Sequence, residues 1–335
     1  MAVPHILARR LVLAPLMALL EIALLLASPF LLVVAVILSP LLGGWRPVRM
    51  LAIVVVFAAR HLEATLLLLA LWLRSGFGAT SASEPMQTAH FDVMRRFVGA
   101  VYRMTVRAAR VRVAVNDSAE VEEVLSAADR PALILARHAG EGDSLLVLHQ
   151  LLCRYGRRPR IVLHEALRLD PVIDVLGRRL PNRFVDPRGG DTEIEIAAIS
   201  ADLDPAGAVL IFPEGANFTE ERRLRGIERL EEGGFHAQAG VARQMRHVSA
   251  PRPGGALAAI EAAPGADVVF VGYVGFPTGL RELWRLLPHP QPVEVRLWHV
   301  PAEEIPAGRD ERIDWLFDRW RTLDAWVGER QRSSG

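Results

Sequence analysis

The sequence predicts an α/β protein with a largely parallel sheet flanked by helices and an N-terminal apolar helical membrane anchor. Two observations lead to this prediction. Beyond the first quarter of the chain, short apolar runs of strand length alternate with segments of helical periodicity, as in parallel α/β domains. The first quarter contains apolar stretches long enough to cross a bilayer, and the mean hydropathy of the 335-residue chain is +0.23.

The expected strands are short runs that are apolar throughout or alternate in polarity. They are Val111–Val115, Ala132–Ala136, Arg160–His164, Arg183–Val185, Ala208–Phe212, Asp267–Gly275 and Val293–Val300. Helical patterns predict helices over Phe91–Thr105, Ser144–Leu152, a segment following Pro171, Glu193–Leu203 and about Arg309–Arg330. In such sheets ligands bind at the carboxyl ends of strands, so polar sequences that follow strands are the first candidates for a site.

The composition excludes several classes of protein. The chain has 39 basic and 38 acidic residues, a net charge of +1, so no overall field recruits nucleic acid. Every basic residue is arginine, which disfavours P-loop nucleotide hydrolases, Schiff-base and pyridoxal phosphate enzymes, and protein kinases, because each needs a lysine. The single cysteine, Cys153, rules out a disulfide framework and a CxxC-type zinc site.

Residues 11–42 are apolar except for one charge, Glu21. One straight membrane span needs about 20 residues. The stretch is therefore expected to form either a long tilted helix or a helical hairpin bent near Pro29. Arg9 and Arg10 precede it, as in a signal peptide, but the apolar run is longer than that of a signal peptide and favours a retained anchor.

A second apolar stretch, Met50–Leu73, carries Arg60, His61 and Glu63 near its middle. Charges at the bilayer centre are costly, so this segment is expected to lie in the membrane interface or to bury Arg60 and Glu63 against the first segment. Residues 1–80 carry a net charge of +4, which favours an anionic membrane surface.

We therefore expect three parts: a membrane anchor over residues 1–75, a linker over 76–90 and an α/β domain over 91–335. The linker is small and polar in sequence. Two spans or one hairpin that enters the membrane from one side would both leave the α/β domain on the cytosolic side of the cell membrane. Lipid bilayer is thus an expected partner, and nucleic acid is not.

The first candidate motif is HAGEGD, which directly follows the apolar strand Ala132–Ala136. Its glycines permit a tight turn that brings Asp143 back to His138. A carboxylate on one ring nitrogen fixes the histidine tautomer and leaves the other nitrogen as a base, which suits removal of a proton from an alcohol. Two other interpretations stay open: Asp143 as a plain helix cap, and a metal site of His138, Glu141 and Asp143.

The second candidate motif is Phe212-Pro213-Glu214-Gly215, at the end of the strand Ala208–Phe212. Proline and glycine at a strand end make a shaped turn where the ligand crevice of a parallel sheet would open. Several arginines follow or precede this motif, and a guanidinium near a strand end can bind a phosphate bidentately. They are Arg222, Arg223, Arg225 and Arg229 after the motif, and Arg183 and Arg188 before it.

The two motifs in this order resemble the glycerolipid acyltransferase family, which carries H-x-x-x-x-D first and F-P-E-G later, each after an apolar strand. The segments FPEGANFTEERRLR (residues 212–225), RHVSAPRPGG (246–255) and the C-terminal residues 294–327 are similar to the lysocardiolipin and lysophosphatidylinositol acyltransferase branch. The resemblance covers roughly residues 90–330. Position 216 is Ala where the family usually has Thr, and Arg137 precedes the histidine where Asn is common.

The resemblance implies transfer of an acyl chain from acyl-CoA or acyl carrier protein, as co-substrate, to the hydroxyl of a lysophospholipid such as 1-acylglycerol 3-phosphate. No cofactor and no metal are expected. His138 would be the general base and Asp143 its orienting partner, with direct attack and no acyl-enzyme. The residues expected to hold the acceptor are Arg188, Phe212, Pro213, Glu214, Gly215 and Arg252, with Arg183 as an alternative to Arg188.

Three rival interpretations stay open on the sequence alone. A transacylase would move chains between phospholipids without a thioester. An α/β-hydrolase would need the G-x-S-x-G serine turn, which the sequence lacks. A membrane-anchored lipid-binding module would not be an enzyme at all.

Overall fold

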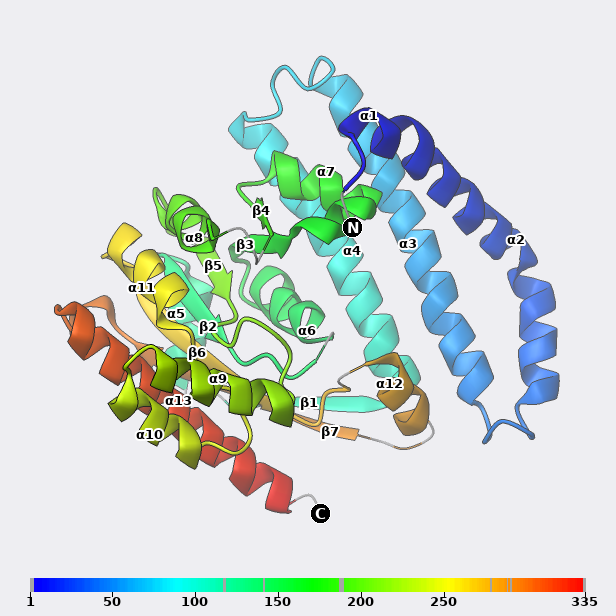
Figure 1. The fold of residues 1–335 in the computed structure, drawn as a ribbon. Coiled ribbons are helices and arrows are strands. Elements are labelled where there is room, and N and C mark those ends of the chain that lie inside the picture. The colour runs from blue at the N-terminus through cyan, green and yellow to red at the C-terminus, as the bar shows by residue number, and fades with distance from the viewer. Residues whose placement is uncertain are drawn as a thin grey trace. The chain divides into compact units, whose positions relative to one another are not determined.

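The structure is a computed structural model that describes residues 3–116, 119–140, 142–186, 190–277, 279–287, 289 and 291–333. Seven strands form a sheet in the order β1-β7-β6-β2-β5-β3-β4 (Figure 1). Their bounds are β1 Val111–Val115, β2 Ala132–Ala136, β3 Arg158–His164, β4 Arg183–Val185, β5 Gly207–Ile211, β6 Asp267–Val274 and β7 Gln291–Val300. The predicted α/β class and all seven predicted strands are confirmed, with boundaries that move by one or two residues.

The centre of the sheet is parallel. Strand β2 pairs in parallel with both β5 and β6, and Ala132 lies opposite Ala208 on one side and Asp267 on the other. Strand β3 is parallel to β4 and β5, whereas β7 is antiparallel to β6. The carboxyl ends of β2, β5 and β6 therefore meet at one edge, where the loops that follow them lie close together.

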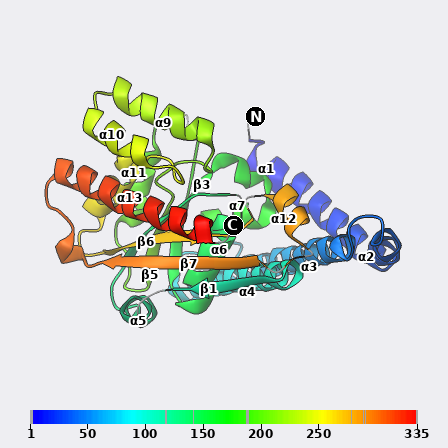
Figure 2. The same cartoon turned by 90° about the horizontal axis from the view of Figure 1, so that it is seen from below.

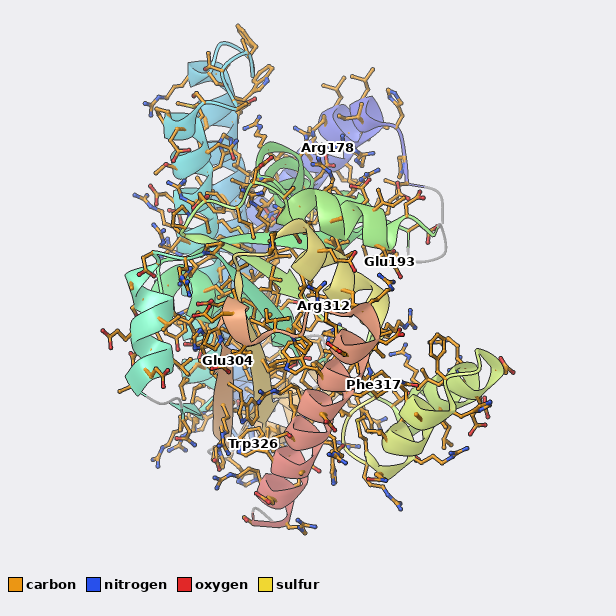
Figure 3. All side chains as sticks on the ribbon, turned by 90° about the vertical axis from the view of Figure 1, so that its left-hand side faces the viewer. Arg178, Glu193, Glu304, Arg312, Phe317 and Trp326 are labelled. Carbon is orange, nitrogen blue, oxygen red and sulfur yellow. The ribbon has the colours of Figure 1, made fainter. Side chains whose placement is uncertain are left out.

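The chain divides into two compact units, and the larger one contains residues 113–161, 191–279 and 292–335. In this unit one apolar layer contains side chains of two helices together with Val269 and Val271 of β6. The helices are α5 (Ala119–Ala127) and α6 (Asp143–His149), and α6 continues as a helix through Gln150–Arg154. Helix α13 (Arg309–Ser333) covers the alternate residues of β6, because Trp315 and Trp320 contact Phe270. Phe317 and Trp326 belong to the same helix (Figure 3).

The same unit contains four further helices. They are α8 (Thr192–Ser200), α9 (Glu220–Glu232), α10 (His236–Gln244) and α11 (Pro253–Ala262). Helices α9 and α10 lie side by side in both ribbon views (Figures 1 and 2). Among the elements not expected from the sequence are α5, α10 and α11, which are short and rich in alanine or charge and so lack a long apolar period.

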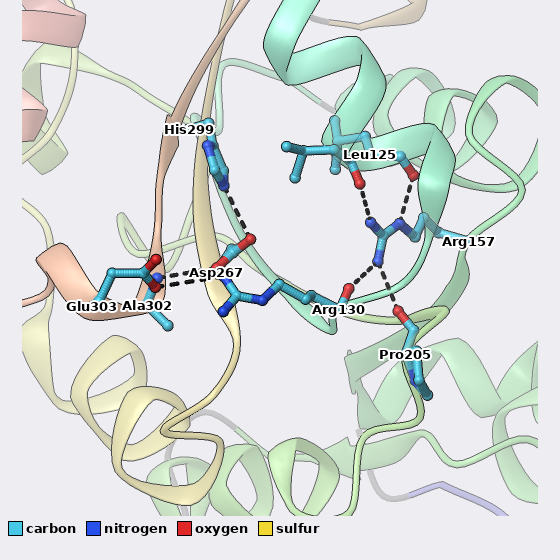
Figure 4. A network of polar contacts seen from close by, with 9 residues as sticks. Leu125, Arg130, Arg157, Pro205, Asp267, His299, Ala302 and Glu303 are labelled. Atoms are coloured by element: carbon cyan, nitrogen blue, oxygen red, sulfur yellow. Dashed lines mark hydrogen bonds and ion pairs between the residues drawn. The ribbon is translucent and has the colours of Figure 1, made fainter.

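A polar network closes the amino-terminal edge of this sheet (Figure 4). The guanidinium of Arg157 is buried and donates to the carbonyl oxygens of Leu125, Arg130 and Pro205, and also to that of Val124. These four carbonyls belong to segments in α5 or leading into β2 and β5. Because buried carbonyls need donors, Arg157 acts as a structural clamp.

The other unit contains residues 1–112, 162–190 and 280–291. Its helices are a continuous helix from Ile6 to Leu38 that includes α2 (Ala14–Leu38), then α3 (Arg46–Arg74), α4 (Glu84–Ala109), α7 (Pro171–Arg179) and α12 (Leu280–Leu286). Figure 1 shows α2 beside α3 and α3 beside α4. Helix α4 begins at Glu84, so the last part of the expected linker over 76–90 is helical.

The first apolar segment is one long helix, which is the first of the two expected alternatives; the hairpin bent near Pro29 is not formed. Pro29 lies inside α2, and the turn to α3 comes later, where Gly43 and Gly44 have positive φ. Pro29 cannot donate to the carbonyl of Leu25, but the hydroxyl of Ser28 donates to this oxygen at 2.7 Å. The helix therefore passes through the proline while the carbonyl of Leu25 keeps a donor.

The structure contradicts one of the two arrangements expected for α3, the burial of Arg60 and Glu63 against the first segment. Arg60 and Glu63 are partly exposed and form an ion pair with each other at 2.5 Å. The buried face of α3 is formed by Ala58, His61, Ala64, Leu68 and Leu71, which recur at helical spacing, and residues 60 and 63 fall outside it. His61 alone of the three polar residues turns inward, where it contacts Glu21 of α2 at 2.5 Å and Asp170 at 3.2 Å.

The N-terminal helix is also fixed at its start. Arg9 and Arg10 each contact the buried carboxylate of Asp174 in α7 at 3.1 Å, and Arg178 contacts the same carboxylate at 3.0 Å. A buried charge needs such partners to offset its desolvation. The two arginines that resemble the start of a signal peptide therefore tie the helix to α7.

Candidate active site

The loop after β2 carries the candidate base. All five residues of β2 are buried, and the chain leaves the sheet at Arg137 and His138. Asp143 is the first residue of α6, as predicted, and is almost fully buried. The backbone between them turns back on itself, because the amide of Gly140 donates to Asp143 Oδ2 at 2.6 Å.

His138 and Asp143 form the predicted pair. His138 Nδ1 lies 3.1 Å from Asp143 Oδ2. A carboxylate only accepts hydrogen bonds, so the proton resides on Nδ1 and the lone pair on Nε2. Within the described part of the chain no group bonds to His138 Nε2, and about one fifth of the side chain is exposed. The imidazole therefore presents a basic nitrogen that a ligand can reach.

Packing fixes the orientation of this imidazole. The ring of Phe212 stacks on it with a centroid distance of 4.4 Å and an interplanar angle of 28°. On the neighbouring turn, a side chain at Gly142 would collide with the ring of Phe276, which follows β6. Aromatic contacts and close backbone approach thus hold the loop that carries the pair.

The Phe-Pro-Glu-Gly turn follows β5. The amide of Gly215 donates to the carbonyl of Phe212 at 3.0 Å, and Gly215 has a φ of +72°, which favours glycine. A side chain at Gly215 would also press against the guanidinium of Arg252. The amide of Phe218 donates to the carbonyl of His138 at 2.7 Å, so this turn is tied directly to the base.

Glu214 is buried and joins two loops. Its Oε1 accepts from the amide of His138 at 2.8 Å, and its Oε2 accepts from the amide of Ser249 at 2.8 Å. Burial raises the pKa of Glu214 to about 7, while the two amides and the charges of Arg137 and His138 act in the opposite direction. Both oxygens are used by the backbone, so in this structure Glu214 holds the loops together.

The third segment of the site lies between α10 and α11. Asp324 of α13 accepts hydrogen bonds from the amides of Arg246, His247 and Val248 at 2.6–3.1 Å. The amide of Arg252 donates to the carbonyl of Pro213 at 2.8 Å. These contacts place the side chain of Arg252 beside the Phe-Pro-Glu-Gly turn.

A pocket of about 150 Å³ opens next to Glu214, and four arginines line it. They are Arg222, Arg225 and Arg229 of α9, and Arg252. The spacing of the α9 residues puts them on one helix face, whereas Arg223 pairs with Glu220 and donates to the carbonyl of Met245. Arg222 donates to the carbonyl of Asn217, and Arg225 pairs with Glu221.

Arg229 and Arg252 have no hydrogen-bond or ion-pair partner for their side chains in the described residues. Burial lowers the pKa of Arg252, and the nearby charge of Arg229 lowers it further. Two guanidinium groups without counter-ions in one pocket form a site for an anion.

The structure brings together most of the residues predicted from the sequence: His138, Asp143, Phe212, Pro213, Glu214, Gly215 and Arg252. Arg188 and Glu141 lie outside the described residues, and Arg183 lies in β4 of the other unit. In the ranges that are described, no three His, Cys, Asp or Glu side chains gather as metal ligands would.

Sequence reasoning missed the contributions of Ser249, Arg137 and Tyr273. Ser249 contributes only a backbone amide, which leaves no sequence signal. Arg137 and Tyr273 exchange hydrogen bonds across β2 and β6, with donor–acceptor distances of 2.6 and 2.5 Å. In the sequence, the signal for a role of this residue was that position 137 is Arg, whereas the glycerolipid acyltransferase family commonly has Asn there.

Comparison with known families agrees with this geometry. Residues 112–271, which include β2, β5, the first part of β6 and the loops after β2 and β5, match the family model described as Acyltransferase. The comparison with curated proteins finds no match. The match supports an acyl-transfer function of the glycerolipid acyltransferase kind, and hence an acyltransferase enzyme.

Proposed function

We propose that the protein is a membrane-bound acyltransferase that moves an acyl chain from acyl-CoA or acyl carrier protein to the hydroxyl of a lysophospholipid such as 1-acylglycerol 3-phosphate. The observation that carries the proposal is the His138–Asp143 contact at the carboxyl end of β2, with Nε2 open to a ligand. The acyltransferase match over residues 112–271 is independent support.

The mechanism follows from the free nitrogen. His138 Nε2 takes the proton of the acceptor hydroxyl while the alcohol oxygen attacks the thioester carbonyl carbon. The carbon–oxygen bond forms, the carbon–sulfur bond breaks, and the imidazolium returns its proton to the departing thiolate. Asp143 stabilises the imidazolium charge during this step. Ser144 follows Asp143 inside α6, and the sequence lacks the G-x-S-x-G turn that presents a serine nucleophile, so the proposed transfer is direct.

The arginine-lined pocket is the proposed site for the anionic head group of the acceptor. It is bounded by Glu214 and Ser249, and Glu214 is bonded to the backbone of the base. Arg229 and Arg252 would supply the charge that a phosphate requires. In this proposal Phe212, Pro213, Glu214 and Gly215 shape the wall between the base and the head group.

The apolar helices are proposed to hold the enzyme at its lipid substrates. Two helices, Ile6–Leu38 and Arg46–Arg74, are long and apolar enough to cross a membrane. Many large apolar side chains of α2 are exposed, including Leu19, Leu26 and Phe30. The first of these helices is bound to α7 at its start through Arg9 and Arg10, and the second leads to α4 at its end. Both ends of the pair of helices therefore stay with the same unit. Cytosolic placement of the catalytic domain would agree with this arrangement.

Replacing the base tests the function directly. His138→Ala should reduce acyl transfer from acyl-CoA to lysophosphatidic acid by about 10²–10⁴-fold, because general base catalysis contributes that much. The measurement is mass spectrometry of the lipid products formed by purified wild-type and variant protein, with unchanged circular dichroism as the control for folding.

The same assay separates the alternatives. Product formed only when an intact phospholipid replaces acyl-CoA would indicate a transacylase. If wild-type protein binds lysolipid but transfers no acyl chain from any donor, the result would indicate a lipid-binding module that is not an enzyme. Turnover of His138→Ala near the wild-type value would refute the mechanism.

The pocket predicts a preference for charged acceptors. Arg229→Gln and Arg252→Gln should each raise the KM for lysophosphatidic acid by about 10-fold or more, because hydrogen bonds to charged groups contribute about 1.5–3 kcal/mol. The turnover of the neutral acceptor monoacylglycerol should not change. Arg243→Gln on α10, which loses an exposed ion pair with Glu231, is the matched control and should behave as wild type. Equal effects on both acceptors would place the head group elsewhere.

The exposed face of α2 predicts binding to vesicles. The double substitution Leu26→Gln and Phe30→Gln should lower the partition of the protein into phospholipid vesicles by at least about 10-fold, since burial of each such side chain contributes about 1.5–3 kcal/mol. Co-sedimentation with vesicles measures it. Phe235→Gln, which changes an exposed aromatic residue in the other unit, is the control. An unchanged partition for the double variant would contradict the proposal.

A further inference from the structure

We propose that Arg137 is a positioning residue for the base: its buried guanidinium fastens together the segments around His138 and supplies a positive charge to the carboxylate of Glu214. The inference rests on the proposed function, because it concerns the same His138 site. Nothing in the resemblance assigns a role to arginine at this position, where the family commonly has Asn.

The contacts of Arg137 link three segments. Its Nη1 donates to the carbonyl of Tyr273 in β6 at 2.6 Å, and its Nη2 donates to the carbonyl of His247 at 3.0 Å. The hydroxyl of Tyr273 returns a hydrogen bond to the carbonyl of Arg137 at 2.5 Å. Arg137 therefore connects the end of β2, which carries His138, to the end of β6 and to the loop that precedes Ser249.

Tyr273 extends this link to the pair itself. The side chain is fully buried, and its hydroxyl also accepts from the amide of Ala139 at 3.4 Å, one residue after the base. Burial raises the pKa of Tyr273 well above its ordinary value, and the negative charge of Asp143 raises it further. The phenol thus stays protonated between Arg137 and the catalytic pair.

The charge of Arg137 has no direct ion pair among the described residues. Only 5% of the residue is exposed, both of its terminal nitrogens bond to carbonyl oxygens, and its Nε is buried without a hydrogen-bond partner in that part of the chain. The buried carboxylate of Glu214 bonds the amide of His138, the residue after Arg137, and the amide of Ser249, two residues after His247, whose carbonyl Arg137 bonds. Glu214 therefore lies against the two segments that Arg137 joins, and the charge of Arg137 acts on it. Hydrogen bonds to carbonyl oxygens would be enough to hold the segments together. The effect of the Arg137 charge on Glu214 is therefore a second role.

Other charged groups also face Glu214, and they limit the size of the effect. His138 lies on the same loop as Arg137, and its charge acts on Glu214 as well. Across the pocket are Arg222, Arg225 and Arg229 of α9, with Arg252 ahead of α11. The segment 246–249 contributes the amide of Ser249, and its other amides are held by Asp324 of α13.

Glu214 must be ionised to accept hydrogen bonds from both amides. A carboxylate accepts from both His138 and Ser249, whereas a protonated carboxyl group has one oxygen that is a donor and opposes an amide. The pKa of Glu214 is raised to about 7 by burial, and the charge of Arg137 works against this rise. Removal of that charge lets the pKa rise further, so a larger fraction of Glu214 is protonated at a given pH.

The sign of the pH effect follows. As the pH falls through the pKa of Glu214, the carboxyl group takes up a proton and the loop of His138 loses an acceptor. In Arg137→Met this loss should begin at a higher pH, so the acidic limb of kcat/KM should move to higher pH. Arg137→Lys keeps the charge but not the planar fork, so it should lose rate and keep the wild-type limb.

The test compares kcat/KM against pH for full-length wild type, Arg137→Met and Arg137→Lys, with acyl-CoA and lysophosphatidic acid. Infrared titration of the Glu214 carboxyl band, assigned with Glu214→Gln, provides a readout that does not require turnover. Arg157→Met is the matched control: it removes another buried arginine bonded to carbonyls, but at the opposite edge of the sheet. It should lower the melting temperature and leave the pH profile unchanged.

An upward shift of the limb and of the Glu214 titration in Arg137→Met, absent from Arg137→Lys and Arg157→Met, is the expected result. Superimposable pH profiles of wild type and Arg137→Met would overturn the inference, as would a displaced limb in Arg137→Lys. If Arg137→Met does not fold, the inference is tested with Arg137→Lys: its acidic limb and its infrared titration of Glu214 should match those of wild type, and a displacement of either would overturn the inference. Failure of the proposed function is distinguishable, because wild type itself would then transfer no acyl chain.

Discussion

The site depends on one constraint, the parallel pairing of β2 with β5 and β6. This pairing brings the ends of three strands to one edge, so that residues far apart in the sequence come within hydrogen-bond distance. The buried carboxylate of Glu214 then joins the backbone of His138 to that of Ser249. The contact between His138 and Asp143 is held from both sides by these backbone bonds and by the ring of Phe212. The imidazole of His138 is thus held at the edge of a buried sheet.

Charge is distributed around this edge with two different purposes. Glu214 and Arg137 are buried, and their partners are mainly backbone amides and carbonyls, so they organise the loops. Arg229 and Arg252 lie in an open pocket without partners in the described residues, so they are available to a ligand. The absence of lysine in the chain makes arginine serve both purposes. Its planar group suits each of them, since it can bond to several carbonyls at once or grip a phosphate with two parallel bonds.

The sequence was sufficient for the fold class because buried parallel strands are apolar along their whole length, as in β2 and β5. It was also sufficient to predict that His138, Asp143 and the Phe-Pro-Glu-Gly turn lie together, because each comes soon after the end of such a strand. It could not assign Glu214, since a carboxylate that binds two amides and one that binds a ligand have the same sequence. It left open whether the first helix bends near Pro29, and the structure shows no bend there, because a proline is tolerated where Ser28 supplies the missing donor. It could not show which face of α3 turns inward, because this is decided by packing against α2 and α4, which buries His61 and leaves Arg60 and Glu63 outside.

A double-mutant cycle on His138 and Asp143 tests the central claim most directly. Purified wild type, His138→Ala, Asp143→Asn and the double variant are compared by kcat/KM for acyl transfer to lysophosphatidic acid. If Asp143 acts only through the imidazole, the asparagine substitution lowers the rate in wild type but has no further effect once the histidine is gone. Losses that multiply in the double variant would show that the two side chains act independently, which would contradict a base oriented by Asp143.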